Sequence, residues 1–198
     1  YIIATTPFGG LRREHRNRST TPQIIDYPCK SREDWEKIKE RLVPDQSRVD
    51  WQGKWEVGLA GSKISVRKDR GSEKLEFTSG RPDWGRGLKG YQRAREKGKF
   101  ICYTASVGYD KIQNYVASER LLMAIITEPE WVYDMYETDA KLVIKMYEIM
   151  KEGGFEFDGV WLSSDLGYRN RLLFSPHHFE EQLRPTFQRL FDYFKNEG

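Results

Sequence analysis

Three short apolar runs separated by helical segments constrain the fold more than any other feature of this sequence. The runs span residues 1–5, 99–109 and 158–163, and each is rich in β-branched or aromatic residues. The segments between them are long enough for helices of about 10 to 20 residues. Apolar strands joined by helices are typical of a parallel sheet that helices cover. The sequence therefore predicts a parallel α/β fold.

The longest predicted helix covers residues 128–152 and has one apolar face. Apolar residues recur on it every three or four positions, which indicates packing against a large core. Thr127 and Glu130 are predicted to form a capping box around Pro129, and Gly153 is predicted to end the helix. The apolar residues of this face are Val132, Met135, Tyr136, Val143, Met146 and Met150.

Shorter helices are predicted from capping residues that precede amphipathic segments. Ser31, Asp110, Ser118 and Ser175 are each expected to cap a helix, and Pro185 is expected to break or kink the last of them. A further short helix is predicted within residues 87–98.

Two other segments carry weaker patterns. The basic stretch "LRREHRNRSTTP", residues 11–22, is expected to be a solvated loop. Residues 51–84 consist of short apolar pieces divided by glycines, which predicts an excursion of strands and loops. The glycines of "GRGLKG", residues 85–90, do not follow a predicted strand. A dinucleotide-binding fold is therefore disfavoured, and a (β/α) barrel is favoured.

The composition excludes several classes of protein. A chain of 198 residues fits one domain, and its 33 Lys and Arg residues are interleaved with 30 Asp and Glu residues. We therefore expect no nucleic-acid partner. No run of about 18 apolar residues occurs, so no membrane segment is expected. Cys29 and Cys102 lack the spacing of a disulfide framework or a metal knuckle, which favours a cytoplasmic location.

Ordered motifs in the second half of the chain resemble one known family. They are Glu119–Leu122 ("ERLL"), Glu128–Glu130 ("EPE"), Asp158–Gly159 ("DG"), Asp165–Gly167 ("DLG"), Ser175–Pro176 ("SP") and Pro185. In this order they resemble the uroporphyrinogen decarboxylase superfamily. This superfamily includes the haem-pathway decarboxylase and cobalamin-linked methyltransferases.

The resemblance implies a (β/α)8 TIM barrel, with its active site at the carboxyl ends of the strands. Residues 1–198 would form a single domain that is only the N-terminal and middle part of the barrel, and we expect more chain beyond Gly198. The segment "LRREHRNRS" does not match the arginine-rich signature of true decarboxylases. The zinc ligands of the methyltransferases would lie outside this chain.

Asp165 is the expected catalytic residue, because it follows the third predicted strand at the end where such barrels do chemistry. Ser164, Tyr168, Arg169 and Tyr109 are the expected substrate-binding residues. The alternative for Asp165 is a carboxylate that only shapes the "DLGYRN" turn. The alternative for Tyr168 and Arg169 is an exposed loop without a ligand. No metal ligands are expected within this chain.

Three functions follow from the resemblance and its departures. The favoured one is methyl transfer from a small methylated substrate, together with a partner corrinoid protein and zinc bound outside this chain. The alternative is an enzyme without a cofactor that decarboxylates the acetate side chains of a tetrapyrrole. The third is a non-catalytic half barrel that associates with a partner or with a second copy of itself.

Overall fold

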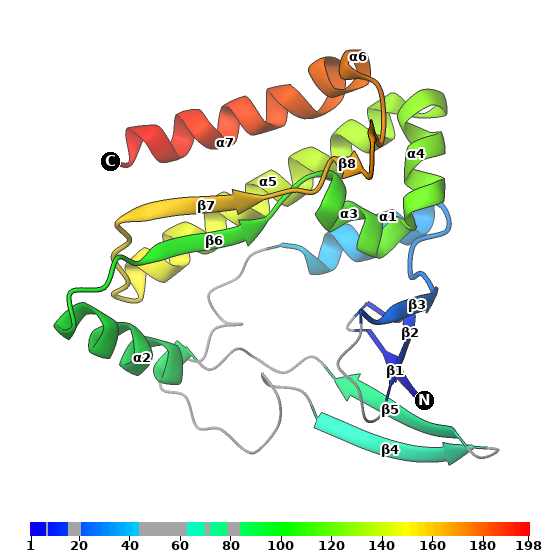
Figure 1. Cartoon of the computed structure of the whole chain (residues 1–198), viewed down its shortest axis with the longest axis horizontal. Coiled ribbons are helices and arrows are strands. Elements are labelled where there is room, and N and C mark those ends of the chain that lie inside the picture. Colours follow the sequence, from blue (N-terminus) through cyan, green and yellow to red (C-terminus); the bar gives the residue numbers. More distant parts are fainter. Residues whose placement is uncertain (7, 16–20, 44–62, 70–71, 79–83) are drawn as a thin grey trace.

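The computed structural model has a mixed α/β architecture (Figure 1). Helices lie along one side of a parallel strand pair, and a separate five-stranded sheet lies at the bottom of the view. This confirms the predicted α/β class. Among the described residues the strands do not close a barrel. The described residues are 1–6, 8–15, 21–43, 63–69, 72–78 and 84–198.

The parallel pair consists of β6 (Cys102–Ser106) and β7 (Gly159–Ser163). These strands are the second and third apolar runs, so their predicted parallel pairing is confirmed. Cys102 lies opposite Gly159, and Ser106 lies opposite Ser163. Both strands thus end at the same edge of the sheet, as parallel neighbours joined by a helical crossover must.

A polar tie joins the two strands at their amino ends. The Asp158 carboxylate accepts the Ile101 amide at 2.7 Å and Arg95 Nη1 at 2.6 Å. Asp158 N also donates to the Ile101 carbonyl at 2.8 Å. Arg95 belongs to α2 (Trp84–Glu96), and its guanidinium holds the pKa of Asp158 below the usual range. The tie therefore anchors α2 to the start of both strands.

Two helices cover one face of the β6–β7 pair. They are α5 (Pro129–Glu152), which is the predicted long helix, and α7 (Arg184–Asn196). Tyr103 of β6 is buried between them, and its hydroxyl donates to the Val143 carbonyl at 2.8 Å. Tyr147 and Leu190 complete this core with aromatic and aliphatic contacts.

A second core forms where the crossover helices meet the first helix of the chain. α3 (Tyr109–Val116), α4 (Ser118–Thr127) and α1 (Arg32–Arg41) pack against the first half of α5. Trp35 of α1 is fully buried there, and its Nε1 donates to Asp134 Oδ2 at 2.8 Å. Lys39 reaches the same carboxylate at 2.6 Å. This pair of donors fixes α1 on α5.

The first apolar run does not join the other two, which corrects the predicted three-stranded parallel sheet. It forms a strand in the five-stranded sheet of order β3-β2-β1-β5-β4. Residues 11–14 also form a strand, so the predicted solvated loop is wrong there, and the described part of residues 51–84 includes an antiparallel strand pair. The strands are β1 (Ile2–Thr5), β2 (Leu11–Glu14), β3 (Gln23–Asp26), β4 (Lys63–Asp69) and β5 (Ser72–Thr78).

Two of the predicted helix caps are confirmed. Ser31 Oγ accepts the Asp34 amide at 3.3 Å, and Ser175 Oγ accepts the His178 amide at 3.3 Å. Ser175 opens α6 (Pro176–His178), which continues through the π-helical segment η3 (Phe179–Leu183) into α7. Pro185 lies in the first turn of α7, where its missing amide is tolerated. The helix therefore changes from π-helical to α-helical geometry just before the proline and does not end there.

Three other predicted caps, Asp110, Ser118 and Thr127, are wrong, because the N-cap positions of these helices fall on Gly108, Ala117 and Glu128 and none of them makes a side-chain cap bond. α3 starts after Gly108 and α4 starts after Ala117, both with positive φ, and Ser118 Oγ bonds to the Tyr109 hydroxyl instead of capping. At α5, Thr127 donates to the Met123 carbonyl, and no side chain caps the helix.

Replacing Ala117 with Gly is expected to stabilise the protein by about 1 kcal/mol. Ala117 has φ 80° and ψ 142°, a backbone region that is costly for any residue with a Cβ. The gain is reduced by the extra freedom of Gly in the unfolded chain. Denaturant unfolding measures the change. The same substitution inside a helix, Ala94→Gly, should lower stability by about 1 kcal/mol, and a loss in both variants would contradict the strain.

Candidate functional site

The candidate site lies at the carboxyl ends of β6 and β7. Ser106 and Ser163 end the two strands side by side, and Val107 N continues the ladder to the Ser163 carbonyl at 2.9 Å. Each strand then enters a turn that carries acidic and hydroxyl side chains. In open and closed parallel sheets alike, this edge is where ligands bind.

On the β6 side, the site is built around Asp110. Ser106 Oγ donates to Asp110 Oδ2 at 3.2 Å, and Gln113 Nε2 donates to Oδ1 at 2.8 Å. Asp110 lies in the first turn of α3, where the helix dipole also favours a negative charge. The carboxylate is half-buried and held in one orientation. It can accept a hydrogen bond from a ligand or stabilise a positive charge.

Below this turn, a buried carboxylate supports the backbone. Asp139 of α5 is 2% exposed, and its Oδ2 accepts the Gly108 amide at 3.2 Å. Burial raises the pKa of Asp139 to about 7, although the charge of Lys111 and the Gly108 amide oppose the rise. Asp139 therefore exchanges between its charged and neutral forms near neutral pH.

On the β7 side, Asp165 lies in an exposed turn. Its Oδ1 accepts the Gly167 amide at 3.1 Å, which is the bond expected of an Asp that shapes a turn. The other carboxylate oxygen of Asp165, Oδ2, belongs to the same exposed side chain. Ser164, just before it, has a buried Oγ without a hydrogen-bond partner among the described residues. A hydroxyl in that state can donate to a ligand that reaches it.

Tyr168 and Arg169 lie on the same loop as Asp165, at the tip of a small hairpin. The hairpin is formed by β8 (Gly167–Tyr168) and β9 (Arg171–Leu172). Tyr168 is 65% exposed, and Arg169 has a φ of 42° in the turn. Ser164, Asp165, Tyr168 and Arg169 thus lie close together on the segment that follows β7, and their role in binding a substrate stays a prediction.

Tyr109 is not brought to this segment. Its side chain is fully buried, and its hydroxyl bonds to Ser118 Oγ. Burial raises the pKa of the phenol, while the bond to Ser118 opposes that rise. The structure places Tyr109 in the core of the crossover helices, so we do not include it among the residues that face a ligand.

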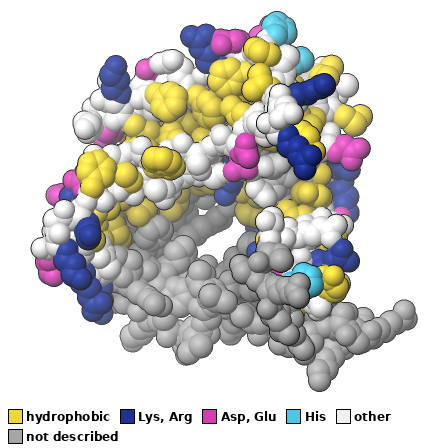
Figure 2. Space-filling model, viewed as in Figure 1, with side chains coloured by type: hydrophobic (Ala, Val, Ile, Leu, Met, Phe, Trp, Pro, Cys, Tyr) yellow, Lys and Arg dark blue, Asp and Glu magenta, His cyan; other side chains and the backbone are white. Residues whose placement is uncertain are grey.

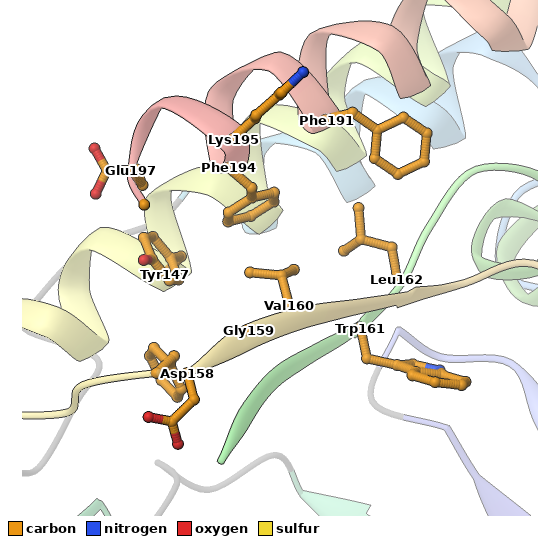
Figure 3. A pocket seen from close by; sticks show the side chains of 12 residues that line it. Tyr147, Asp158, Gly159, Val160, Trp161, Leu162, Phe191, Phe194, Lys195 and Glu197 are labelled. Atoms are coloured by element: carbon orange, nitrogen blue, oxygen red, sulfur yellow. The ribbon is translucent and has the colours of Figure 1, made fainter. Parts of the chain in front are cut away.

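The face of the strand pair opposite α5 and α7 carries a mixture of polar and aromatic side chains. Thr104 and Ser163 are exposed there, and Trp161 is 66% exposed. Figure 3 shows Trp161 on the other side of β7 from Leu162, Phe191 and Phe194. An indole beside hydroxyl groups offers a flat apolar wall together with hydrogen-bonding partners.

A separate groove runs along β7 on the side of α7 (Figure 3). Its walls are Val160 and Leu162 from the strand and Phe191 and Phe194 from the helix, and its volume is about 460 Å³. Among the described residues, β7 pairs with β6 along one edge and with no strand along the other. Apolar side chains gather around this region in the upper part of Figure 2.

Sequence reasoning missed the two buried or half-buried acids of the site. Asp110 was expected only to cap a helix, and its two side-chain donors come from residues close in sequence, Ser106 and Gln113. Asp139 has a clearer signal. It interrupts the apolar face of the long helix, three residues after Tyr136 and four before Val143, and an acid at such a position must be buried with a partner.

Comparisons with family models, with curated proteins and with solved structures gave no match to this chain. Within the described ranges, no group of three or more His, Cys, Asp or Glu side chains is arranged to hold a metal ion. None of the described helices combines the length and the apolar character needed to cross a membrane.

Proposed function

We propose that this chain is part of a (β/α) barrel enzyme of the uroporphyrinogen decarboxylase superfamily, in its methyltransferase-like branch. The substrate would be a small methylated compound, and the methyl acceptor a corrinoid carried by a partner protein. The observation that carries the proposal is the position of Asp165. It lies two residues after the end of β7, at the edge where β6 ends at Ser106 and α3 presents Asp110.

The layering of the described elements supports a barrel. α5 and α7 cover one face of the β6–β7 pair, while the other face carries exposed polar and aromatic side chains. In a (β/α) barrel the outer face of each strand packs against helices, and the inner face lines the interior. The groove between β7 and α7 has apolar walls, and among the described residues β7 has no strand partner along its second edge, where the next strand of a barrel would pair.

In this proposal Asp165 and Asp110 orient the substrate at the carboxyl edge. Two carboxylates favour a substrate that carries hydrogen-bond donors or positive charge, and Trp161 offers a wall for its apolar part. When bound, zinc would activate a thiol, and we expect its ligands outside the described residues. The described side chains would hold and orient the substrate.

Replacing Asp165 with Asn tests the catalytic role against the turn-forming role. Asn keeps an oxygen that can accept the Gly167 amide, so the turn should survive, while the negative charge is lost. We expect methyl transfer to the corrinoid protein to fall by about 100-fold or more, with unchanged unfolding behaviour. Initial rates with methanol, methylamine and an aryl methyl ether, measured on the full protein that contains this chain, give the readout.

The matched control is Asp192→Asn on the exposed side of α7, which should keep full activity. Full activity in Asp165→Asn would reduce Asp165 to a turn former. The same preparations are assayed for loss of carbon dioxide from a tetrapyrrole with acetate side chains, without the corrinoid protein. Turnover there and not in methyl transfer would replace the proposal with the decarboxylase alternative.

A further inference from the structure

The turn between β6 and α3 is fixed from two sides. From below, Asp139 Oδ2 accepts the Gly108 amide. From above, the Gly108 Cα packs so closely on η3 and α7 that an added Cβ would lie 2.8 Å from Leu183 Cδ1 and 3.4 Å from Phe187. Gly108 itself has φ 64° and ψ −135°, which only glycine adopts at low cost. The turn therefore has one arrangement while Asp139 holds it.

This turn connects directly to the candidate site. Val107 N bonds to the Ser163 carbonyl, which joins the turn to the end of β7. Ser106 precedes the turn, Asp110 follows it, and their side chains bond to each other across it at 3.2 Å. A change in the Gly108 backbone must therefore move one partner of that bond relative to the other.

The groups that face Asp139 come from each element packed around it. α3 contributes Lys111, whose charge favours the ionised carboxylate, and Tyr115. β6 contributes Tyr103, and burial raises the pKa of both phenols far above neutrality, so neither titrates with Asp139. Arg189 of α7 is paired with Glu137 on α5. Asp139 is thus the group in this cluster that changes charge near neutral pH.

We propose that Asp139 is a positioning residue of the candidate site, acting through the Gly108 amide to set where Ser106 and Asp110 stand. The effect of Asp139 on Ser106 and Asp110 does not depend on the proposed function. Its consequence for a bound substrate rests on that proposed function. An ionised carboxylate accepts a stronger hydrogen bond from an amide than a neutral carboxyl group does. The turn is therefore held more firmly as pH rises through neutrality.

Amide NMR of the whole protein tests the proposal without a substrate. In the wild type, the Gly108, Val107 and Ser106 amide signals should shift together between about pH 5 and about pH 9, with one shared midpoint near neutrality. In Asp139→Asn that midpoint should vanish from all three signals. The control Glu130→Gln removes an exposed acid from the same helix and should leave the midpoint unchanged.

Two results would overturn the proposal. Flat Gly108 signals in the wild type would show that Asp139 does not titrate against this amide, and this measurement needs no variant to fold. A Gly108 midpoint without a matching shift of Ser106 would show that the turn does not pass the change to the site. Neither result depends on catalytic turnover, so failure of the proposed methyl transfer would be seen separately.

Discussion

Replacing Asp139 with Asn is expected to stabilise the protein above neutral pH. The pKa of Asp139 is raised from an ordinary value of 3.8 to about 7 in the folded state, because burial disfavours the charge. Between these two values the folded chain binds one proton more than the unfolded chain, so this group makes stability fall as pH rises. The full penalty is present above the folded-state pKa. An Asn side chain resembles the neutral form and avoids the penalty.

The expected size is large for a single substitution. The difference in free energy of unfolding between the Asp139→Asn variant and the wild type should grow by at most about 1.4 kcal/mol per pH unit between about pH 4 and about pH 7. It should then level off. Urea unfolding at a series of pH values measures it, and subtracting the wild-type curve removes the contributions of the other acids. A difference that is constant with pH would show that Asp139 keeps an ordinary pKa.

Replacing Gly108 with Ala is expected to destabilise the protein by about 2 to 4 kcal/mol. Two causes add: an alanine strained at φ 64° and ψ −135°, and a methyl group 2.8 Å from Leu183 Cδ1. Relief of either cause moves the turn and weakens the bond from Gly108 N to Asp139. Thermal and denaturant unfolding measure the loss.

Gly90→Ala is the matched control for that loss. Gly90 lies within α2, and nothing stands within 4 Å of an added Cβ. Alanine there should stabilise the helix by up to about 1 kcal/mol, because glycine has more freedom to lose on folding. Equal effects of the two substitutions would mean that the Gly108 turn is looser than its contacts indicate.

The helices and the parallel pair could be predicted because their signals are local. The 3.6-residue period of α5 indicates which face of the helix is buried, and the apolar runs of β6 and β7 indicate buried strands. The pairing of β1 could not be predicted, since it depends on β2 and β5 rather than on its own residues. Charged Arg12 and Arg13 hid β2, because strand propensity depends on neighbours more than helix propensity does.

The position of Asp165 after β7 could be predicted from the sequence, but the hydrogen-bonded acids Asp110 and Asp139 near the same edge were missed. Asp165 and its loop follow β7 as the strand order implied, and their catalytic role stays a prediction. Tyr109 was expected to face a substrate because it follows the end of a strand. That position does not say which side of α3 its side chain lies on, and the side chain is buried in the core. Asp139 could have been found, since an acid on an apolar helix face has few reasons to be there apart from a buried partner.

The bonds between Arg95, Asp158 and Ile101 fix the register of β6 relative to β7. Asp158 immediately precedes β7 and bonds to Ile101, which immediately precedes β6. The two strands therefore begin side by side. Five residues later, Ser106 and Ser163 emerge together. Deleting one residue from either strand would turn its side chains to the opposite faces. The ion pair at the amino ends of the two strands thus helps to align the candidate site at their carboxyl ends.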